Sequence, residues 1–468
     1  MSTYRVFNHY IRVPFLILGL IEIFILIVSV FIGVLIRKEG EFDGIREIIN
    51  SHLFEAFLFA IIMVLAMIAS GLYQARLREG IFGFILRLTT AFLLGTVALS
   101  VIFYFVPDIF LGRGVLILSI LGSFVSISVV RVVIQSLDQN VFKKRIVVLG
   151  AGKRASSITD LRRRSDQFGF KILGFIQLPG EENIVAEEKI IKLGIPLMSY
   201  IEKHDIDEIV LAVEDRRKGI PMHELLDCKM RGVDILDVVT FFERETGKIR
   251  LDQLHPSWFL FSDGFNYGAA REWFKRIFDA SASFFLLSIT WPFMLLTAVA
   301  IFLESRCKLG TPILYRQVRV GREGRPFQVL KFRSMIVNAE ASGKAQWATK
   351  NDSRVTRVGT FIRMTRIDEL PQIFNVFRGD MSFVGPRPER PEFVVMLSEK
   401  IPYYSERHRV RPGITGWAQL LYPYGSSEKD ALEKLQYDLY YVKNHSVFLD
   451  FLIMLQTAEV VLFGRGAR

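Results

Sequence analysis

The sequence predicts a membrane protein built from a four-helix transmembrane bundle, a small doubly wound α/β domain, and a mixed α/β domain that carries a fifth membrane segment. Of the 468 residues 51% are hydrophobic, more than soluble domains usually contain. Four early apolar runs are each long enough to cross a bilayer. Short strand-like segments then alternate with helical ones, as in α/β domains. The expected parts are 1–140, 141–240, a linker 241–270, and 271–468.

The four apolar runs of the bundle are 13–36, 53–73, 81–106 and 110–134. Arg5 and Arg12 precede the first run, and Lys143, Lys144 and Arg145 follow the fourth. Because basic residues accumulate on the cytoplasmic side, both ends of the bundle are expected there. Glu22 lies inside the first run, where an ionisable group is costly, so we expect it to make a polar contact between helices.

The α/β domain is predicted from three strand patterns, RIVVLGAG, DEIVLAV and VDILDVV, separated by helical stretches. Gly150, Gly152 and Ala155 form a GxGxxA turn after the first strand, which is typical of Rossmann-like domains and their dinucleotide sites. The next strand ends at Gln177, where a ribose-binding acid would be expected. We therefore favour a structural or regulatory module over a nucleotide site, and predict no bound cofactor there.

The fifth apolar run, 278–303, has Pro292 near its middle and basic residues on both sides. Most of the formal net charge of +11 lies from Arg271 onward, and a fifth crossing would place this basic part outside. Charge on both flanks disfavours crossing, and a proline breaks the helical hydrogen-bond ladder. We expect a re-entrant helix near 273–304 that enters and leaves through the cytoplasmic face. The final apolar run, 447–463, is predicted to pack on the membrane surface.

The stretch 363–389, RMTRIDELPQIFNVFRGDMSFVGPRPE, places the adjacent carboxylates Asp368 and Glu369 among arginines. Such a pair suits chemistry on phosphates, because carboxylates hold metals or attack phosphorus while guanidinium groups bind phosphate oxygens. A solvated helix with ion pairs is the alternative. Pro371 is expected in the first turn of a helix led by the acid pair. Upstream, a hairpin is predicted to carry Lys331 and Arg333 on its second strand.

Four motifs in order, KRIFD, KFRSM, IDELPQIFNVFRGDMSFVGPRPE and RVRPGITGWAQ, resemble those of bacterial polyprenyl-phosphate glycosyl-1-phosphate transferases. These are the monotopic phosphoglycosyl transferases that start exopolysaccharide and O-antigen synthesis. The resemblance covers about 271–464, and the layout of the whole chain is similar to that of the family's large members. The C-terminal tail is most similar to the sugar transferases of exopolysaccharide clusters, including the PEP-CTERM-associated group.

The resemblance implies a monotopic catalytic domain on the cytoplasmic face of the bacterial inner membrane. Its substrates would be a UDP-sugar and undecaprenyl phosphate, and UMP would be released through a phospho-aspartyl enzyme. Asp368 matches the nucleophile, and Glu369 matches the acid that helps to hold Mg²⁺ beside it. Pro292 matches the break in the re-entrant helix. The expected phosphate-binding residues are Lys331, Arg333, Arg363 and Arg387.

Two positions depart from the family pattern: Arg366 replaces a small hydroxyl residue, and Trp291 precedes the breaking proline where a serine is common. They leave the local phosphate and lipid contacts and the sugar preference open. UDP-glucose or UDP-galactose is expected, with N-acetylated sugars also open. A homodimer is compatible with the layout, and no nucleic acid partner is expected.

Two other functions are compatible with parts of the sequence. A membrane nucleotide-sugar dehydratase would need a YxxxK pair, and none of the 14 tyrosines has lysine four residues later. A non-catalytic membrane scaffold or nucleotide sensor would leave the acid pair and the four ordered motifs unexplained.

Overall fold

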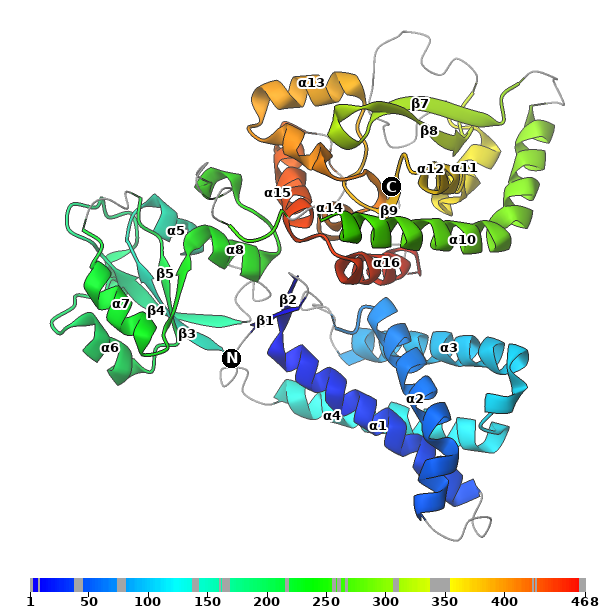
Figure 1. The fold of residues 1–468 in the computed structure, drawn as a ribbon, viewed down its shortest axis with the longest axis horizontal. Coiled ribbons are helices and arrows are strands. Elements are labelled where there is room, and N and C mark those ends of the chain that lie inside the picture. Colours follow the sequence, from blue (N-terminus) through cyan, green and yellow to red (C-terminus); the bar gives the residue numbers. More distant parts are fainter. Residues whose placement is uncertain are drawn as a thin grey trace. The chain divides into compact units, whose positions relative to one another are not determined.

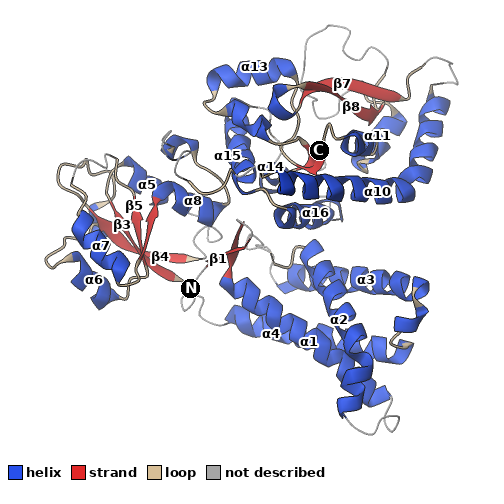
Figure 2. Cartoon of the chain, viewed as in Figure 1, coloured by secondary structure: helices blue, strands red, loops and turns tan. Residues whose placement is uncertain are grey.

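The computed structural model forms two compact units, Met1–Gly247 and Lys248–Arg468 (Figures 1 and 2). It describes residues 3–6, 9–37, 45–73, 81–136, 143–159, 161, 169–214, 219–254, 258, 262–265, 268–305, 311–336, 354–422, 425 and 427–462. The polar, loop-like sequence 338–353 lies outside these residues.

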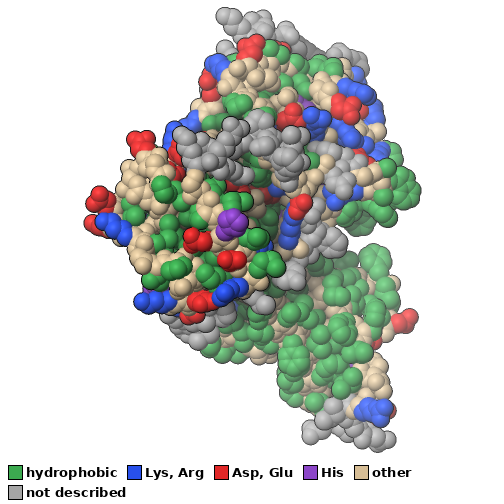
Figure 3. Space-filling view, turned by 60° about the vertical axis from the view of Figure 1, so that its left-hand side comes forward, with side chains coloured by type: hydrophobic (Ala, Val, Ile, Leu, Met, Phe, Trp, Pro, Cys, Tyr) green, Lys and Arg blue, Asp and Glu red, His purple; other side chains and the backbone are tan. Residues whose placement is uncertain are grey.

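The apolar runs of the first unit form helices α1 (Val13–Arg37), α2 (Ile45–Ala69), α3 (Ile81–Phe105) and α4 (Arg113–Ser136). Each is long and apolar enough to cross a membrane. Hydrophobic side chains cover the surface of these helices in Figure 3. Helix α2 begins before the predicted run at residue 53. The prediction missed the start of the helix because Arg46 and Glu47 in its first turn lower the local hydropathy. A short hairpin, β1 (Thr3–Val6) and β2 (His9–Arg12), precedes the bundle.

Glu22 makes the interhelical contact expected from the sequence. Its carboxylate is buried and accepts a hydrogen bond from Arg131 Nε of α4 at 2.5 Å. Arg131 Nη1 also donates to the Leu72 carbonyl at 2.7 Å, and the Tyr73 hydroxyl donates to Glu22. A buried charge is tolerated in such a bundle because each polar group has a partner. The cluster therefore ties α1, α4 and the end of α2 together.

The α/β part of the first unit is a parallel four-stranded sheet in the order β4-β3-β5-β6. Its strands are β3 (Lys144–Leu149), β4 (Phe170–Ile176), β5 (Glu208–Leu211) and β6 (Asp234–Asp237). Its helices are α5 (Lys153–Thr159), α6 (Leu197–His204), α7 (Met222–Met230) and α8 (Val238–Thr246). The predicted parallel α/β region is confirmed.

The segment 241–270, expected to be a linker, begins within a helix. Helix α8 continues to Thr246, and Phe241 and Phe242 are fully buried. Their burial gives this segment a helical amphipathic face that the aromatic and polar composition concealed. Gly247 then ends the helix with a φ of 65°.

In the second unit, helix α10 (Ala269–Glu304) is followed by an antiparallel hairpin and a series of short elements. The hairpin strands are β7 (Leu314–Val320) and β8 (Pro326–Phe332). Then come α11 (Arg357–Met364), a 3-10 turn (Ile367–Glu369), α12 (Gln372–Arg378), β9 (Ser382–Val384), α13 (Pro391–Lys400), β10 (Gly413–Thr415), α14 (Trp417–Leu421), α15 (Glu428–Asn444) and α16 (Val447–Leu462). The hairpin and the final apolar helix agree with the sequence predictions.

Helix α10 is one continuous helix with Pro292 inside it. Figure 1 shows its C-terminal arm turned sharply away from its N-terminal arm. A proline inside a helix removes one hydrogen bond and is the usual cause of such a bend. The break predicted at this position is therefore a bend within an uninterrupted helix, and the membrane face on which it begins and ends stays a prediction.

The C-terminal arm of α10 packs directly on the elements around the acid pair. Ile301 forms a small buried core with Phe332 and Ile362, and Ile367 packs against this core. These three partners are the chain neighbours of Lys331, Arg363 and Asp368. The same apolar contacts therefore hold the strand, helix and turn that carry these polar side chains.

Candidate active site

The acid pair lies in a 3-10 turn between α11 and α12. Glu369 N donates to the Arg366 carbonyl at 3.2 Å, and Leu370 N donates to the Ile367 carbonyl at 3.1 Å. Arg366 begins the turn in the left-handed region, with φ of 60°. Pro371 precedes α12 and the acids do not lead that helix, so the prediction on this point is wrong. The reason is that proline cannot donate a backbone hydrogen bond, which separates the turn from the helix.

Glu369 is held by two cations that come from different parts of the chain. Lys331 Nζ donates to Glu369 Oε1 at 2.8 Å, and Arg387 Nη2 lies 3.7 Å from the same oxygen. Burial alone would raise the pKa of Glu369, but the charges of Lys331 and Arg387 outweigh it and lower the pKa to about 2. Glu369 is therefore ionised at neutral pH, and its Oε1 is the oxygen that lies beside both cations.

Asp368 has the opposite electrostatic environment although it is the adjacent residue. Its side chain is buried, with 8% of the residue exposed. Burial and the neighbouring charge of Glu369 raise the pKa of Asp368 to about 6, against the positive charges of Lys331, Arg363 and Arg366. The turn thus presents one carboxylate neutralised by cations and one without a close ion pair among the described residues.

The structure gathers most of the predicted site residues. Lys331 and Arg387 contact Glu369, and Arg363 at the end of α11 is near enough to Asp368 to influence its charge. Arg333 differs, since its guanidinium donates to Ser305 Oγ at the end of α10. Pro292 lies within the bent membrane helix rather than among these side chains.

Sequence reasoning missed two buried polar residues beside the site. Asn375 is 1% exposed and bonds the main chain of β8. Arg407 Nη2 donates to the Arg387 carbonyl at 3.0 Å and lies 2.8 Å from Asp438 Oδ2. Asn375 stands within the third motif and Arg407 lies two residues before the fourth, but nothing local separates a buried amide or guanidinium from an exposed one.

The acid pair fits a magnesium ion that shares its coordination with a substrate. Among the described residues, no group of three or more His, Cys, Asp or Glu side chains is arranged to hold a metal. Mg²⁺ commonly takes only one or two carboxylates from the protein and completes its shell with substrate phosphates and water. Asp368 and Glu369 supply this number of hard oxygen ligands, since only one Glu369 oxygen bonds Lys331.

The glycine turn of the α/β domain does not fit the phosphates of a dinucleotide. Ala151 N donates to Glu181 Oε2 at 3.0 Å, and Lys153 N donates to Glu214 Oε1 at 2.7 Å. A Cβ at Gly152 would lie 3.0 Å from Glu214 Oε1 and 3.1 Å from Glu181 Oε1. The place a diphosphate would take is therefore occupied by two carboxylates of the chain itself.

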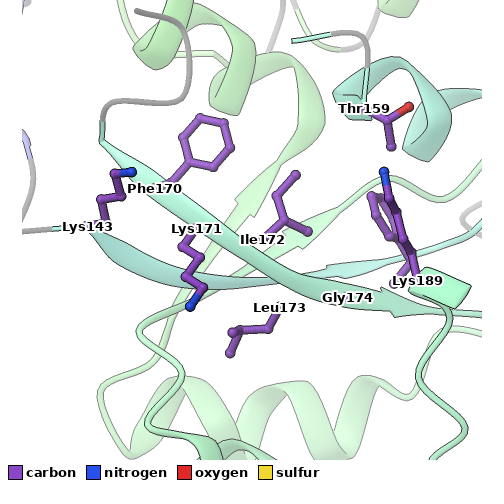
Figure 4. Close-up of a pocket in the computed structure, with 9 residues that line it drawn as sticks. Lys143, Thr159, Phe170, Lys171, Ile172, Leu173, Gly174 and Lys189 are labelled. Carbon is purple, nitrogen blue, oxygen red and sulfur yellow. The ribbon is translucent and has the colours of Figure 1, made fainter. Parts of the chain in front are cut away.

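A cavity of about 320 Å³ lies along strand β4 in the first unit. It is lined by Lys143, Thr159, Lys171, Lys189 and the strand itself (Figure 4). In this view the amines of Lys171 and Lys189 point in opposite directions, so the lysines do not converge on one anion. None of the predicted site residues lines this cavity.

Residues 68–225 match the CoA-binding domain family. CoA contains a diphosphate, and the carboxylates of Glu181 and Glu214 at the turn do not fit that group either. The match and the parallel sheet describe the fold of this region. The turn after β3 is held by hydrogen bonds to the loops that carry the two glutamates.

We expect CoA and NAD to leave the melting temperature of the full-length protein unchanged. A ligand present at about 100 times its Kd would stabilise the protein by about 2.7 kcal/mol, which such a measurement detects readily. Glu181→Ala should instead destabilise the protein by about 1 kcal/mol, because the Ala151 amide loses its acceptor. Stabilisation by CoA that Gly152→Val removes would contradict this interpretation of the turn.

Residues 270–464 match the bacterial sugar transferase family. A UDP-glucose:undecaprenyl-phosphate glucose-1-phosphate transferase of Xanthomonas campestris is 30% identical over 75% of this chain and 74% of its own length. A protein of the same name from Klebsiella pneumoniae is 35% identical over 67% of each chain. A UDP-N-acetylgalactosamine-undecaprenyl-phosphate N-acetylgalactosaminephosphotransferase of Aeromonas hydrophila is 42% identical, over 52% of this chain and 56% of its own length.

These matches favour the transferase over the scaffold and the dehydratase. The chain belongs to the bacterial sugar transferase family and is a polyprenyl-phosphate glycosyl-1-phosphate transferase of the membrane.

Proposed function

We propose that the protein transfers a sugar-1-phosphate from a UDP-sugar to undecaprenyl phosphate and releases UMP, as the first membrane step of exopolysaccharide or O-antigen synthesis. The observation that carries the proposal is the turn in which cations neutralise Glu369 while Asp368 has no close ion pair among the described residues. The names of the relatives support the acceptor and the type of sugar donor.

In the first step an Asp368 oxygen attacks the phosphorus that carries the sugar. The bond between Asp368 and phosphorus forms, the bond to the UMP oxygen breaks, and UMP leaves with the electron pair. In the second step an oxygen of the lipid phosphate attacks the same phosphorus and displaces the Asp368 carboxylate. A nucleophilic carboxylate divides one phosphoryl transfer into two easier ones.

The remaining residues act on charge and position. Lys331 and Arg387 neutralise Glu369. Their remaining N–H groups would bind the diphosphate oxygens. Arg363 would bind a phosphate oxygen beside Asp368. Asp368 and Glu369 would hold Mg²⁺, which when bound neutralises the diphosphate. Arg333 would bind a phosphate through the guanidinium nitrogens that do not donate to Ser305.

The bend of α10 supports a site at the cytoplasmic face of the bacterial inner membrane. Basic residues flank the helix, and Pro292 lies within it. A helix that enters and leaves by one face would keep the acid pair within reach of a lipid phosphate, because the C-terminal arm packs on Ile362 and Ile367. In a variant with Cys228→Ser and Cys307→Ser, a cysteine introduced at Ser305 should be labelled only from the cytoplasmic side. Labelling from outside would contradict this topology.

UMP release from membranes containing the protein, Mg²⁺ and a panel of UDP-sugars tests the function. We expect steady release with at least one of UDP-glucose, UDP-galactose and their N-acetylated forms, and only when undecaprenyl phosphate is present. Without the lipid, release should stop at about one UMP per enzyme, as a covalent intermediate requires. Continuous release without lipid would contradict the proposed acceptor step.

A further inference from the structure

Asn375 is buried between the acid pair and the hairpin. It lies on α12, six residues after Glu369, and is 1% exposed. Its Oδ1 accepts from Leu330 N at 3.0 Å, and its Nδ2 donates to the Gln328 carbonyl at 2.7 Å and faces Asp380 Oδ2 at 3.5 Å. Both the oxygen and the nitrogen of the buried amide therefore make hydrogen bonds.

These bonds meet the edge of β8 that does not face β7. The two strands form a two-stranded sheet, so the outer edge of β8 presents main-chain groups that need other partners. One side chain satisfies both the acceptor at Gln328 and the donor at Leu330. Asn375 thus takes the place of a neighbouring strand at this point.

Lys331 is the next residue along the strand, and its Nζ reaches Glu369 at 2.8 Å. The path from the acid pair through α12, Asn375 and β8 back to Glu369 is a closed ring of contacts. The Asn375 carbonyl also accepts from Gly379 N and Asp380 N, both at 3.0 Å, which fixes the end of α12. The side chain of Asn375 therefore links the strand that carries Lys331 to the helix that follows the acid pair, in addition to the apolar core of Ile301, Phe332 and Ile362.

We infer that Asn375 is a positioning residue that sets the register between Lys331 and Glu369. The inference rests on the proposed function of the acid pair. Asn375 does not contact the reacting groups; it acts through the main chain of β8. An alanine would leave the Gln328 and Leu330 groups without partners and free the strand to shift, and shifts of about 1 Å at a site cost on the order of 10²-fold in rate.

A double-mutant cycle on kcat/KM for UMP release by the full-length protein tests this. Asn375→Ala should lower kcat/KM at least about tenfold. In a Lys331→Arg background the cation no longer has the same reach. The factor by which Asn375→Ala lowers kcat/KM in that background should differ at least about fivefold from the factor in the wild type. In an Arg363→Lys background, which changes the cation beside Asp368 and not a contact of Glu369, the loss should match that in the wild type within about twofold, since residues in one contact network couple and others add.

Asn444→Ala is the matched control, because Asn444 is also a fully buried asparagine of this unit and donates to the Tyr440 carbonyl within α15. Asn444→Ala should lower kcat/KM by the same factor in all three backgrounds, whatever its effect on stability. Equal losses for Asn375→Ala in all three backgrounds would overturn the inference. Asn375→Asp, which keeps the size but cannot donate to Gln328, gives the same comparison if the alanine variant folds poorly. If the wild-type protein released no UMP from any UDP-sugar of the panel, the proposed function of the site would fail instead.

Discussion

Asp368→Asn should abolish sugar-1-phosphate transfer, with kcat reduced at least about 10⁴-fold, the scale on which loss of a catalytic nucleophile acts. The amide has the size of the carboxylate but does not displace UMP from phosphorus. Radiolabelled UDP-sugar should also leave no label on the protein. The fold should persist, because burial raises the pKa of Asp368, so its charge is unfavourable in the folded state and a neutral amide removes that penalty.

Asp380→Asn is the control for this prediction, since Asp380 lies in the same motif and is 4.0 Å from Arg378. Its Oδ2 also faces Asn375 Nδ2 at 3.5 Å, a contact that the oxygen of the new amide can keep. We expect it to retain activity within about tenfold, as a surface ion pair contributes little. Undiminished UMP release by Asp368→Asn, or equal losses in the two variants, would remove Asp368 as the nucleophile.

Much of the fold could be predicted because it depends on local pattern. The apolar runs of α1 to α4, the parallel strands and the β7–β8 hairpin all follow from periodicity over short windows. The adjacency of Asp368 and Glu369 is covalent, so the acid pair needed no knowledge of the fold. The contact of Glu22 with another helix followed from the cost of a lone charge in a membrane.

The contacts that distinguish the two acids could not be predicted, because they join distant parts of the chain. Lys331 and Glu369 are 38 residues apart, and the partners Glu181 and Glu214 of the glycine turn come 30 and 61 residues after it. A GxGxxA motif predicts only the backbone conformation of the turn. Which anion occupies the turn depends on residues that the tertiary structure brings to it. The same applies to Arg333, whose partner Ser305 lies on another element.

Glu369→Gln should lower kcat/KM at least about 10³-fold, more than the loss of one transition-state hydrogen-bond donor alone usually costs. The amide cannot neutralise Lys331 and Arg387, which lie 2.8 and 3.7 Å from Glu369 Oε1, so two cations would repel each other in a half-buried site. The Mg²⁺ concentration for half-maximal activity should also rise at least about tenfold, as the proposed role of Glu369 in holding the ion predicts.

The magnesium dependence separates two roles of Glu369. If the carboxylate only oriented Lys331, activity would fall while the magnesium requirement stayed the same, and that outcome would contradict its place as a metal ligand. Glu389→Gln is the matched control, because Glu389 lies in the adjoining PRPE segment and is 3.6 Å from Arg319 rather than beside Lys331. Since its charge is outside the acid pair, we expect its activity within about fivefold of the wild type and an unchanged magnesium requirement.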